Sequence, residues 1–320
     1  MADSVTPLAI DVRNLVREFR KGSEPPVVAL NGISFGVRPG EIFGLMGPNG
    51  AGKSTTIRIL TTLLTPTSGE ASILGHDVAR APLEVRRRIV AVLQENAVEI
   101  FLSVKDNFRT FGRFHGLSAR EIEMRSERVI ELFGLGEVRS QKPIDLSGGL
   151  KRRVQVAKVF MVDKPIVFLD EATTGMDTMN KRATINAIRE EAGRGRTIVL
   201  TTHVMDEAEE LCNRLLIINH GRVVASGTPE EVKALSLRLF TLTFTVGDVS
   251  PAVLDAVRAC RPLETRVREN TVEVTLRDEP TALAILAGVA AVSPVLHFEM
   301  SGSTLEDAFL HLLDEESRPS

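Results

Sequence analysis

The sequence predicts an α/β domain with a mostly parallel core sheet, followed by a small α+β domain. Strands and helices alternate around a glycine-rich loop at 47–55, and such alternation indicates a mostly parallel sheet. Helical periodicity alone continues from about 95 to 163, which predicts a helical insert. From about residue 236 the order β-α-β-β-α-β predicts a ferredoxin-like fold. We therefore expect one domain at 1–235 and a C-terminal accessory or regulatory domain at 236–320.

The 320 residues have an ordinary globular composition, with 43% hydrophobic and 25% charged residues. A net charge of −3 gives no electrostatic argument for a nucleic-acid surface, so we expect no nucleic-acid partner. Cys212 and Cys260 match no metal or redox spacing, which is typical of thiols in a reducing compartment. The longest uncharged run, 280–296, contains two prolines and is shorter than the roughly 20 apolar residues of a membrane span. We therefore expect a chain that does not cross a membrane by itself.

Two strands and a turn are expected before the glycine-rich loop. Residues 8–19 show the partial alternation of an edge strand, and 27–37 are predicted to form a second strand or hairpin arm. Pro39-Gly40 predicts a turn before the apolar run 41–46, which has the length of a core strand. Apolar residues then recur at helical spacing up to Leu64, so we expect a helix to follow the loop to that residue.

The later elements alternate as a parallel sheet requires. The expected helices of the first domain span 83–88, 103–115, 118–134, 150–162, 179–192 and 205–212. The expected strands span 69–75, 89–93, 166–171, 197–202, 214–219 and 222–225. In the second domain we expect strands at 240–246, 263–268, 271–277 and 292–299, and helices at 251–260, 280–290 and 304–313. Ser303 or Thr304 is the expected N-cap of the last helix.

The segment 47–55 follows a strand, opens a helix and has the phosphate-loop pattern G-x-x-x-x-G-K-[ST]. Its glycines let backbone N–H groups wrap an anion, and the helix directs its positive dipole end at the same place. Lys53 can reach terminal phosphates, and the Ser54 hydroxyl suits Mg²⁺. A surface loop that matches by chance is the alternative, at roughly one chain in a hundred. The expected nucleotide-binding residues of the loop are Gly47, Pro48, Asn49, Gly50, Ala51, Gly52, Lys53, Ser54 and Thr55.

Two carboxylates close the predicted strand at 166–171. Asp170 is well placed to meet Mg²⁺, and Glu171 to activate a water for attack on a terminal phosphate. For this pair taken alone, a solvated turn is the alternative. His203 ends another predicted strand, and ligands of open α/β sheets lie beyond the carboxyl ends of the strands. Taken alone, this histidine is better interpreted as packed or hydrogen-bonded.

A third short element precedes the helix predicted at 150–162. The sequence Leu146-Ser147-Gly148-Gly149-Leu150 places Ser-Gly-Gly at a helix N-terminus, where bare N–H groups bind anions. A simple helix cap is the alternative for this segment alone. Because the phosphate loop, the carboxylates, the histidine and this segment occur in one order along the chain, we interpret them jointly.

In that order, the motifs closely resemble those of the nucleotide-binding subunit of ABC transporters, over about residues 8–235. The loop at 47–55 resembles the Walker A motif, and 166–170 resembles Walker B, with Glu171 in the place of the catalytic glutamate. His203 matches the switch histidine. The remaining resemblances are Ser147, Gly148 and Gly149 to the signature motif, Gln94 to the Q-loop glutamine, Asp177 to the D-loop, and Phe19 to the aromatic residue that stacks on adenine.

This resemblance implies an ABC cassette of the P-loop NTPase fold, including an antiparallel β subdomain, that binds and hydrolyses ATP with Mg²⁺. It implies catalytic roles for Glu171, His203 and Lys53, and metal contacts from Ser54, Gln94 and Asp170. Each ATP is then expected between the Walker motifs of one cassette and the signature motif of a second copy or close homologue. The helical insert is expected to dock on a separate polytopic membrane permease, at the cytoplasmic face of the cell membrane.

Two segments also resemble the daunorubicin-resistance-type exporter ATPases, namely Gln94-Glu95-Asn96 with 101–104, and the ending at 303–310. Leu150 departs from the usual glutamine of the signature motif, so we expect weaker nucleotide contact there, and Ala172 departs from the usual proline. Drugs, lipids, polysaccharides and peptides are all compatible with this resemblance as cargo. The alternative functions are a non-transport ABC-type ATPase that acts on ribosomes or DNA, and a regulatory module whose C-terminal domain senses a ligand.

Overall fold

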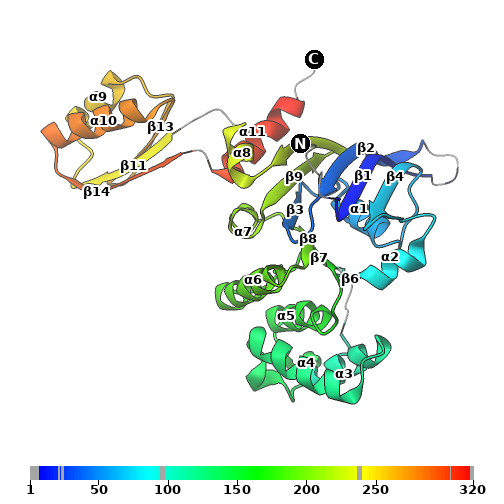
Figure 1. The fold of residues 1–320 in the computed structure, drawn as a ribbon. Helices are drawn as coiled ribbons and strands as arrows, with labels where there is room; N and C mark the ends of the chain where they lie inside the picture. The colour runs from blue at the N-terminus through cyan, green and yellow to red at the C-terminus, as the bar shows by residue number, and fades with distance from the viewer. Residues whose placement is uncertain are drawn as a thin grey trace, which may run out of the picture. The chain divides into compact units, whose positions relative to one another are not determined.

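A computed structural model of the chain describes residues 7–20, 22, 25–93, 98–235, 240–302 and 304–317. The chain divides into two compact units, Met1–Thr228 and Pro229–Ser320, and each is described by itself (Figure 1). The division comes before the expected boundary at residue 235, because helix α8 (Pro229–Ala234) belongs to the second unit, where it contacts α11 (Leu305–Ser317).

A six-stranded sheet forms the core of the first unit, in the order β10-β9-β3-β8-β7-β6. All neighbours are parallel except the β10–β9 pair, which confirms the predicted mostly parallel sheet. Every residue of β3, β7 and β8 is buried, which is why these strands appear in the sequence as continuous apolar runs. The strands are β3 (Ile42–Met46), β6 (Ile89–Val92), β7 (Ile166–Asp170), β8 (Thr197–Thr201), β9 (Arg214–Asn219) and β10 (Arg222–Gly227).

A second, antiparallel sheet has the order β2-β1-β4-β5. The prediction of an edge strand at 8–19 is wrong, because β1 lies between β2 and β4 and pairs with both. Its alternating residues Ile10, Val12 and Leu15 are buried in the cluster that also contains Phe43 of the core sheet. The half-buried pattern was therefore a signal of packing on one face, not of an edge position. The strands are β1 (Ile10–Phe19), β2 (Val27–Val37), β4 (Ser68–Ile73) and β5 (His76–Asp77).

Helices α3, α4 and α5 form the helical insert, which Figure 1 shows beyond the β6 side of the core sheet. Helix α1 begins at Lys53 but ends at Leu60, short of the predicted Leu64, because Thr62 adopts a left-handed φ of 62°. The N–H groups of Leu63 and Leu64 both bond to the carbonyl of Arg58 in that closing turn. The helices are α1 (Lys53–Leu60), α2 (Pro82–Arg88), α3 (Val104–Phe114), α4 (Ala119–Leu132), α5 (Gly148–Val159), α6 (Thr178–Gly193) and α7 (Met205–Leu211), with 3₁₀ turns at Gly136–Val138 and Pro143–Asp145.

The second unit has the predicted β-α-β-β-α-β order, in an antiparallel sheet arranged β12-β13-β11-β14. Its core contains the alternating Leu242, Phe244 and Val246 of β11 together with apolar residues of α9 and α10. Thr304 caps α11, since its Oγ1 accepts from the N–H of Asp307 at 3.1 Å, and the alternative cap Ser303 lies outside the described residues. The elements are β11 (Phe240–Val246), α9 (Pro251–Ala259), β12 (Glu264–Arg268), β13 (Thr271–Leu276), α10 (Glu279–Val292) and β14 (Val295–Gly302). Within the described part of both units, none of the helices combines the length and apolar character needed to span a membrane.

Candidate active site

The glycine-rich loop joins β3 to α1 and depends on glycine for two separate reasons. Gly47, Gly50 and Gly52 have φ values of 148°, 81° and 115°, which residues with a Cβ rarely adopt. A Cβ on Gly47 would lie 2.1 Å from the carbonyl oxygen of Ile218, and one on Gly52 would lie 2.7 Å from that of Ala29. The loop is therefore pressed against neighbouring backbone, which fixes its path over the end of the core sheet.

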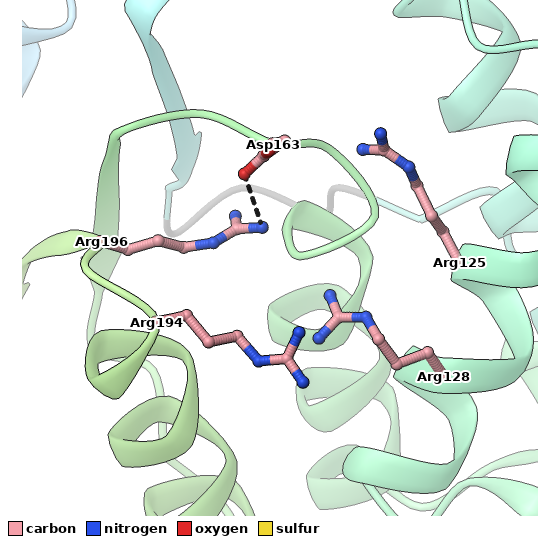
Figure 2. A pocket seen from close by; sticks show the side chains of 5 residues that line it. All are labelled: Arg125, Arg128, Asp163, Arg194 and Arg196. Carbon is pink, nitrogen blue, oxygen red and sulfur yellow. Dashed lines mark ion pairs between the residues drawn. The ribbon is translucent and has the colours of Figure 1, made fainter.

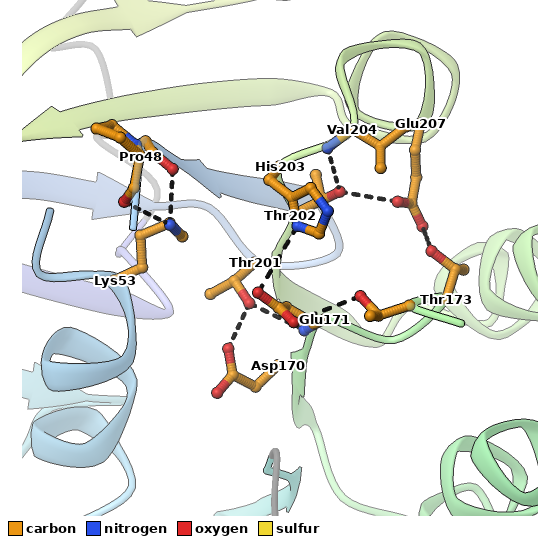
Figure 3. A network of polar contacts seen from close by, with 12 residues as sticks. Pro48, Lys53, Asp170, Glu171, Thr173, Thr201, Thr202, His203, Val204 and Glu207 are labelled. Carbon is orange, nitrogen blue, oxygen red and sulfur yellow. Dashed lines mark hydrogen bonds and ion pairs between the residues drawn. The ribbon is translucent and has the colours of Figure 1, made fainter. Parts of the chain in front are cut away.

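Lys53 is the first residue of α1, and its side chain is buried against the loop (Figure 3). Its Nζ donates to the carbonyl oxygens of Gly47 at 2.6 Å and Pro48 at 2.9 Å. Burial lowers the pKa of Lys53, while the carboxylates of Glu171 and Asp170 oppose that change. The loop thus holds a buried ammonium group within the electrostatic reach of both predicted carboxylates.

Residues 49–55 and Glu171 line a cavity of about 270 Å³ above the loop. An adjoining cavity is lined by Gly47, Pro48, Asn49, Glu171 and His203. The N-cap of α1 is Gly52, which has no side chain to cap the helix, so the positive dipole end of α1 is suited to an anion at this place. The structure therefore places the whole predicted loop around these two adjoining cavities, and Glu171 lines both.

Asp170 and Glu171 lie at the carboxyl end of β7 and are organised by one residue of the neighbouring strand. Thr201 of β8 donates its hydroxyl to a carboxylate oxygen of the buried Asp170. The same Oγ1 accepts from the backbone N–H of Glu171 at 3.0 Å. Glu171 has a left-handed φ of 52°, a conformation that a residue with a side chain keeps only when its surroundings enforce it. Sequence reasoning missed Thr201, because a threonine at a strand end gives no local signal.

His203 faces Glu171 across the cavity (Figure 3). Its Nδ1 lies 3.7 Å from the Oε1 of Glu171, and 53% of its side chain is exposed against 18% for Glu171. The hydroxyl of Thr174 donates to the other Glu171 oxygen at 3.4 Å. The exposure of His203 argues against a packed histidine, and the partial burial of Glu171 argues against a solvated turn, whereas the alternative of a histidine bonded to a polar neighbour is compatible with the 3.7 Å contact.

A buried carboxylate that sequence reasoning also missed supports the loop around His203. Glu207 is 4% exposed and accepts from the hydroxyls of Thr173 and Thr202, the latter at 2.8 Å. The Thr202 hydroxyl in turn accepts from the N–H of Val204 at 3.0 Å. The network joins the loop after β7 to the loop after β8 (Figure 3). In the sequence Glu207 belongs to an acidic helical run that is indistinguishable from a solvated face.

Arg152 of α5 is the third residue that sequence reasoning missed. Its guanidinium donates to the backbone oxygens of Asp170 and of Glu171, the latter from Nε at 3.2 Å and Nη2 at 3.1 Å. Nη1 also donates to the carbonyl of Leu93 at 3.3 Å and to the side chain of Gln155 at 2.9 Å. Burial lowers the pKa of Arg152, and the two carboxylates oppose that change. Arg152, a side chain of the helical insert, therefore binds the main chain at both carboxylate residues. It also binds the main chain at Leu93, the residue before Gln94.

Ser147 is the N-cap of α5, and its Oγ accepts from the N–H of Leu150 at 3.3 Å. A helix cap was the alternative interpretation, and the side chain does perform that role. Gly149 is buried where a Cβ would lie 3.1 Å from the carbonyl oxygen of Gly175, so only glycine fits without displacement. Gly148 is exposed and borders a different cavity from that of the glycine-rich loop. Among the described residues, the Ser-Gly-Gly segment therefore does not line the cavity above the glycine-rich loop of the same chain, which we call the loop cavity.

Asp177 and Phe19 line neither of the two cavities at the loop. Asp177 is the N-cap of α6 and accepts from the N–H of Asn180 at 3.0 Å, and this hydrogen bond lowers the pKa of Asp177. Phe19 ends β1 with 41% of its surface exposed, and the Arg17 guanidinium lies 4.6 Å from the centre of its ring. Gln94, predicted to contact nucleotide and metal, lies outside the described residues.

Comparison with known sequences places this geometry in context. The sequence profile of the family described as ABC transporter matches residues 30–174. The chain is 34% identical to the daunorubicin resistance ATP-binding protein DrrA3 of Streptomyces coeruleorubidus, over 91% of this chain and 92% of that protein. It is 35% identical to the Nod factor export ATP-binding protein I of Rhizobium meliloti (strain 1021), over 97% of this chain and 89% of that protein.

Solved structures give a similar result for the first unit. An ATP-binding subunit of an ABC transporter is 30% identical with a TM-score of 0.63, covering 71% of this chain and 92% of that one. A dimeric post-hydrolysis state of an ATP-binding cassette, bound to ADP and Pi, is 25% identical with a TM-score of 0.63, covering 68% of this chain and 98% of that one. The fold around the glycine-rich loop therefore matches that of nucleotide-binding cassettes.

Proposed function

Because the chain belongs to the ATP-binding proteins of ABC transporters and is therefore an ATPase, we propose that it powers export through a separate membrane permease. The observation that carries the catalytic part of this proposal is the arrangement of Lys53 and Glu171 at the cavity above the loop, with His203 beside Glu171 in the adjoining cavity. A cation, a carboxylate and a histidine that face one phosphate-sized space are the groups that phosphoryl transfer requires.

In this proposal Glu171 acts as the general base. Its carboxylate borders the loop cavity, so it can accept a proton from a water that attacks the terminal phosphate. His203, whose Nδ1 lies 3.7 Å from the Oε1 of Glu171, holds the terminal phosphate. Lys53 offsets charge on the transferring group when it exchanges its backbone acceptors for phosphate oxygens.

The chain also carries donors that fit Mg²⁺, which prefers oxygen ligands from one or two protein groups together with phosphates and water. Ser54, which carries a hydroxyl, lines the loop cavity. Asp170 bonds to Thr201 through one carboxylate oxygen, and its second oxygen can serve a metal directly or through water. We propose that these two residues hold the ion, which would supply charge neutralisation on the phosphates, with Gln94 as a further ligand.

The position of Ser147, Gly148 and Gly149 supports a site completed by a second cassette. In its own chain Gly148 borders a cavity other than the loop cavity, although a helix start with two glycines suits an anion. A head-to-tail dimer would bring the Ser-Gly-Gly segment of one copy over the glycine-rich loop of another. In this dimer Asp177 would lie at the same interface, and Phe19 would stack on the adenine of the nucleotide. The solved cassette that binds ADP and Pi is a dimer.

Arg152 is proposed as a positioning residue rather than a catalytic one. It follows the Ser-Gly-Gly segment by less than one helical turn and bonds to the backbone of Glu171 and Leu93. Movement of that segment upon contact with a second cassette would therefore be transmitted to the carboxylate, and to the chain that leads to Gln94. This coupling would link dimer closure to hydrolysis.

An exposed apolar surface on the helical insert is the proposed dock for the permease. Ile100, Phe101 and Leu102 are 37%, 68% and 37% exposed, and Ile144, 45% exposed, donates its N–H to the carbonyl of Ile100. Contiguous exposed apolar residues of this kind mark interaction sites. The dock would place the chain at the cytoplasmic face of the membrane.

Co-purification tests this proposal directly. We expect the chain to co-purify with a polytopic membrane protein encoded beside it, and Phe101→Asp to abolish that association while the ATPase activity of the isolated chain is kept. The matched control is Phe114→Asp, which changes a more exposed phenylalanine of α3 outside this surface. Retained association in the Phe101 variant, or equal loss in the control, would argue against the proposed dock.

The two relatives are named for different cargoes, one for daunorubicin resistance and the other for Nod factor export. Both nevertheless match this chain with similar sequence identity. We therefore propose that the permease selects the cargo and that this chain responds to its conformation. The second unit, Pro229–Ser320, is proposed as an accessory or regulatory domain.

A further inference from the structure

Four arginines from two parts of the first unit converge on one cavity (Figure 2). The cavity measures about 310 Å³ and is lined by Arg125 and Arg128 of α4, Arg194 and Arg196 at the end of α6, and Asp163. This volume lies at the lower end of the range of small-ligand sites. The catalytic mechanism described above uses none of these residues.

The cavity lies at the opposite edge of the core sheet from the proposed ATP site. Asp163 and Arg196 precede the strands β7 and β8, whereas Glu171 and His203 follow the same strands. Because these two strands are parallel, their amino ends meet at one edge and their carboxyl ends at the other. A ligand in the arginine cavity is therefore separate from the nucleotide at the glycine-rich loop.

The four arginines of the cavity carry more positive charge than the buried carboxylate beside them can neutralise. Glu191 is fully buried and serves three guanidinium groups, with a direct ion pair to Arg128, 3.0 Å to the Nε of Arg196 and 3.7 Å to the Nε of Arg194. The other carboxylates that pair with these arginines are more exposed: the side chain of Asp163 is 80% exposed, that of Glu190 54% and that of Glu121 43%. Exposed ion pairs contribute little, so a bound anion can displace such a partner at small cost.

Backbone carbonyls hold the arginines in place without a ligand. Arg128 donates to the carbonyl of Phe160 at 3.1 Å, and Arg196 donates to that of Val162 at 2.8 Å. Arg196 is nine-tenths buried, and burial lowers its pKa; Glu191 and Asp163 oppose that change, whereas the nearby Arg128 and Arg125 charges add to it. Each guanidinium presents five N–H donors, of which the protein acceptors use only part. The donors that remain are pre-positioned for an oxyanion.

We propose that this cavity is a binding site for a small phosphate-class anion of about the size of pyrophosphate. The anion would replace Glu121, the exposed partner of Arg125, and Glu190, the exposed partner of Arg194, while the buried Arg128–Glu191–Arg196 cluster stays intact. Because α4 belongs to the helical insert and Arg194 and Arg196 belong to the core, the bound anion would brace one part against the other. This would regulate how readily the insert moves during the ATPase cycle.

The test uses inorganic pyrophosphate as the probe and the full chain as Lys53→Ala, which disables the phosphate loop. Calorimetric titration is expected to show one pyrophosphate bound per chain. The double variant Arg125→Gln/Arg194→Gln in the same background should bind at least about tenfold more weakly, as expected for the loss of charged hydrogen bonds. These side chains are 26% and 50% exposed, so the fold is expected to survive. Arg120→Gln, an exposed arginine of the same helix, is the matched control and should bind as its parent does.

Three results would overturn the proposal. The first is no detectable binding at millimolar pyrophosphate in the Lys53→Ala protein. The second is binding that the double variant and the Arg120 control weaken equally, which would indicate non-specific attraction to surface charge. The third concerns a lipid headgroup as the alternative source of phosphate. Binding to phosphatidylglycerol vesicles that depends on Arg125 and Arg194, without binding of pyrophosphate, would assign the cavity to a membrane surface instead.

Discussion

Arg152 provides a test of how Glu171, the proposed general base, is positioned. Substitution by glutamine removes the donors that reach the backbone oxygens of Leu93, Asp170 and Glu171. A hydrogen bond from a charged donor contributes about 1.5–3 kcal/mol, and the left-handed backbone at Glu171 relies on its surroundings. Because a displacement of about 1 Å at a reacting group lowers rates about a hundredfold, we expect kcat to fall about ten- to hundredfold. The KM for ATP should change by less than about threefold, since the loop that binds phosphate is untouched.

Steady-state ATP hydrolysis and calorimetric ATP binding, measured on the same folded preparations, separate these two quantities. Arg182→Gln, an exposed arginine of α6, is the control and should leave both unchanged. Arg152→Lys should recover only part of the rate, because an ammonium is a point charge that cannot bridge several oxygens as a planar guanidinium does. The reasoning is refuted if folded Arg152→Gln keeps kcat within about twofold of wild type, or if KM rises while kcat stays constant.

Three further substitutions test other contacts of the site. Lys53→Ala should reduce ATP affinity itself, as measured by calorimetry, and unchanged affinity would remove the lysine from the site. Leu150→Gln should raise ATP affinity in the dimer by restoring a polar side chain at the start of α5; no gain would show that the position is neutral. Thr201→Val keeps the shape but removes the hydroxyl shared by Asp170 and Glu171, so kcat should fall about tenfold; an unchanged rate would mean that the backbone alone orders the carboxylates.

The core strands and the glycine-rich loop were predictable because their signals are local. Strands β7 and β8 are buried over their whole length, so their apolar runs define them without knowledge of partners. The loop pattern is specific because the backbone path admits only glycine at positions such as Gly47. The order of strands and helices after residue 236 was sufficient to predict the fold of the second unit, because each of these elements also has a local signal.

The supporting residues were not predictable, because their roles arise from contacts between distant parts of the chain. Thr201 gains its role from Asp170, 31 residues away, and Arg152 from Leu93, 59 residues away. Glu207 has the appearance of a surface residue and is buried only because Thr173 and Thr202 satisfy it. The edge position wrongly predicted for β1 has the same origin, since its second neighbour β4 lies beyond the loop and α1.

The central claim is that the loop of one chain and the Ser-Gly-Gly segment of another form one ATPase site. It is tested most directly by the mass of the Glu171→Gln protein in solution, measured by light scattering with ATP and with ADP. We predict a dimer with ATP, a monomer with ADP, and turnover reduced at least about a hundredfold, because binding remains while the base is lost. The added substitution Gly148→Asp should return the protein to a monomer in ATP. A Glu171→Gln protein that stays monomeric in saturating ATP, or that hydrolyses ATP at the wild-type rate, would contradict the claim.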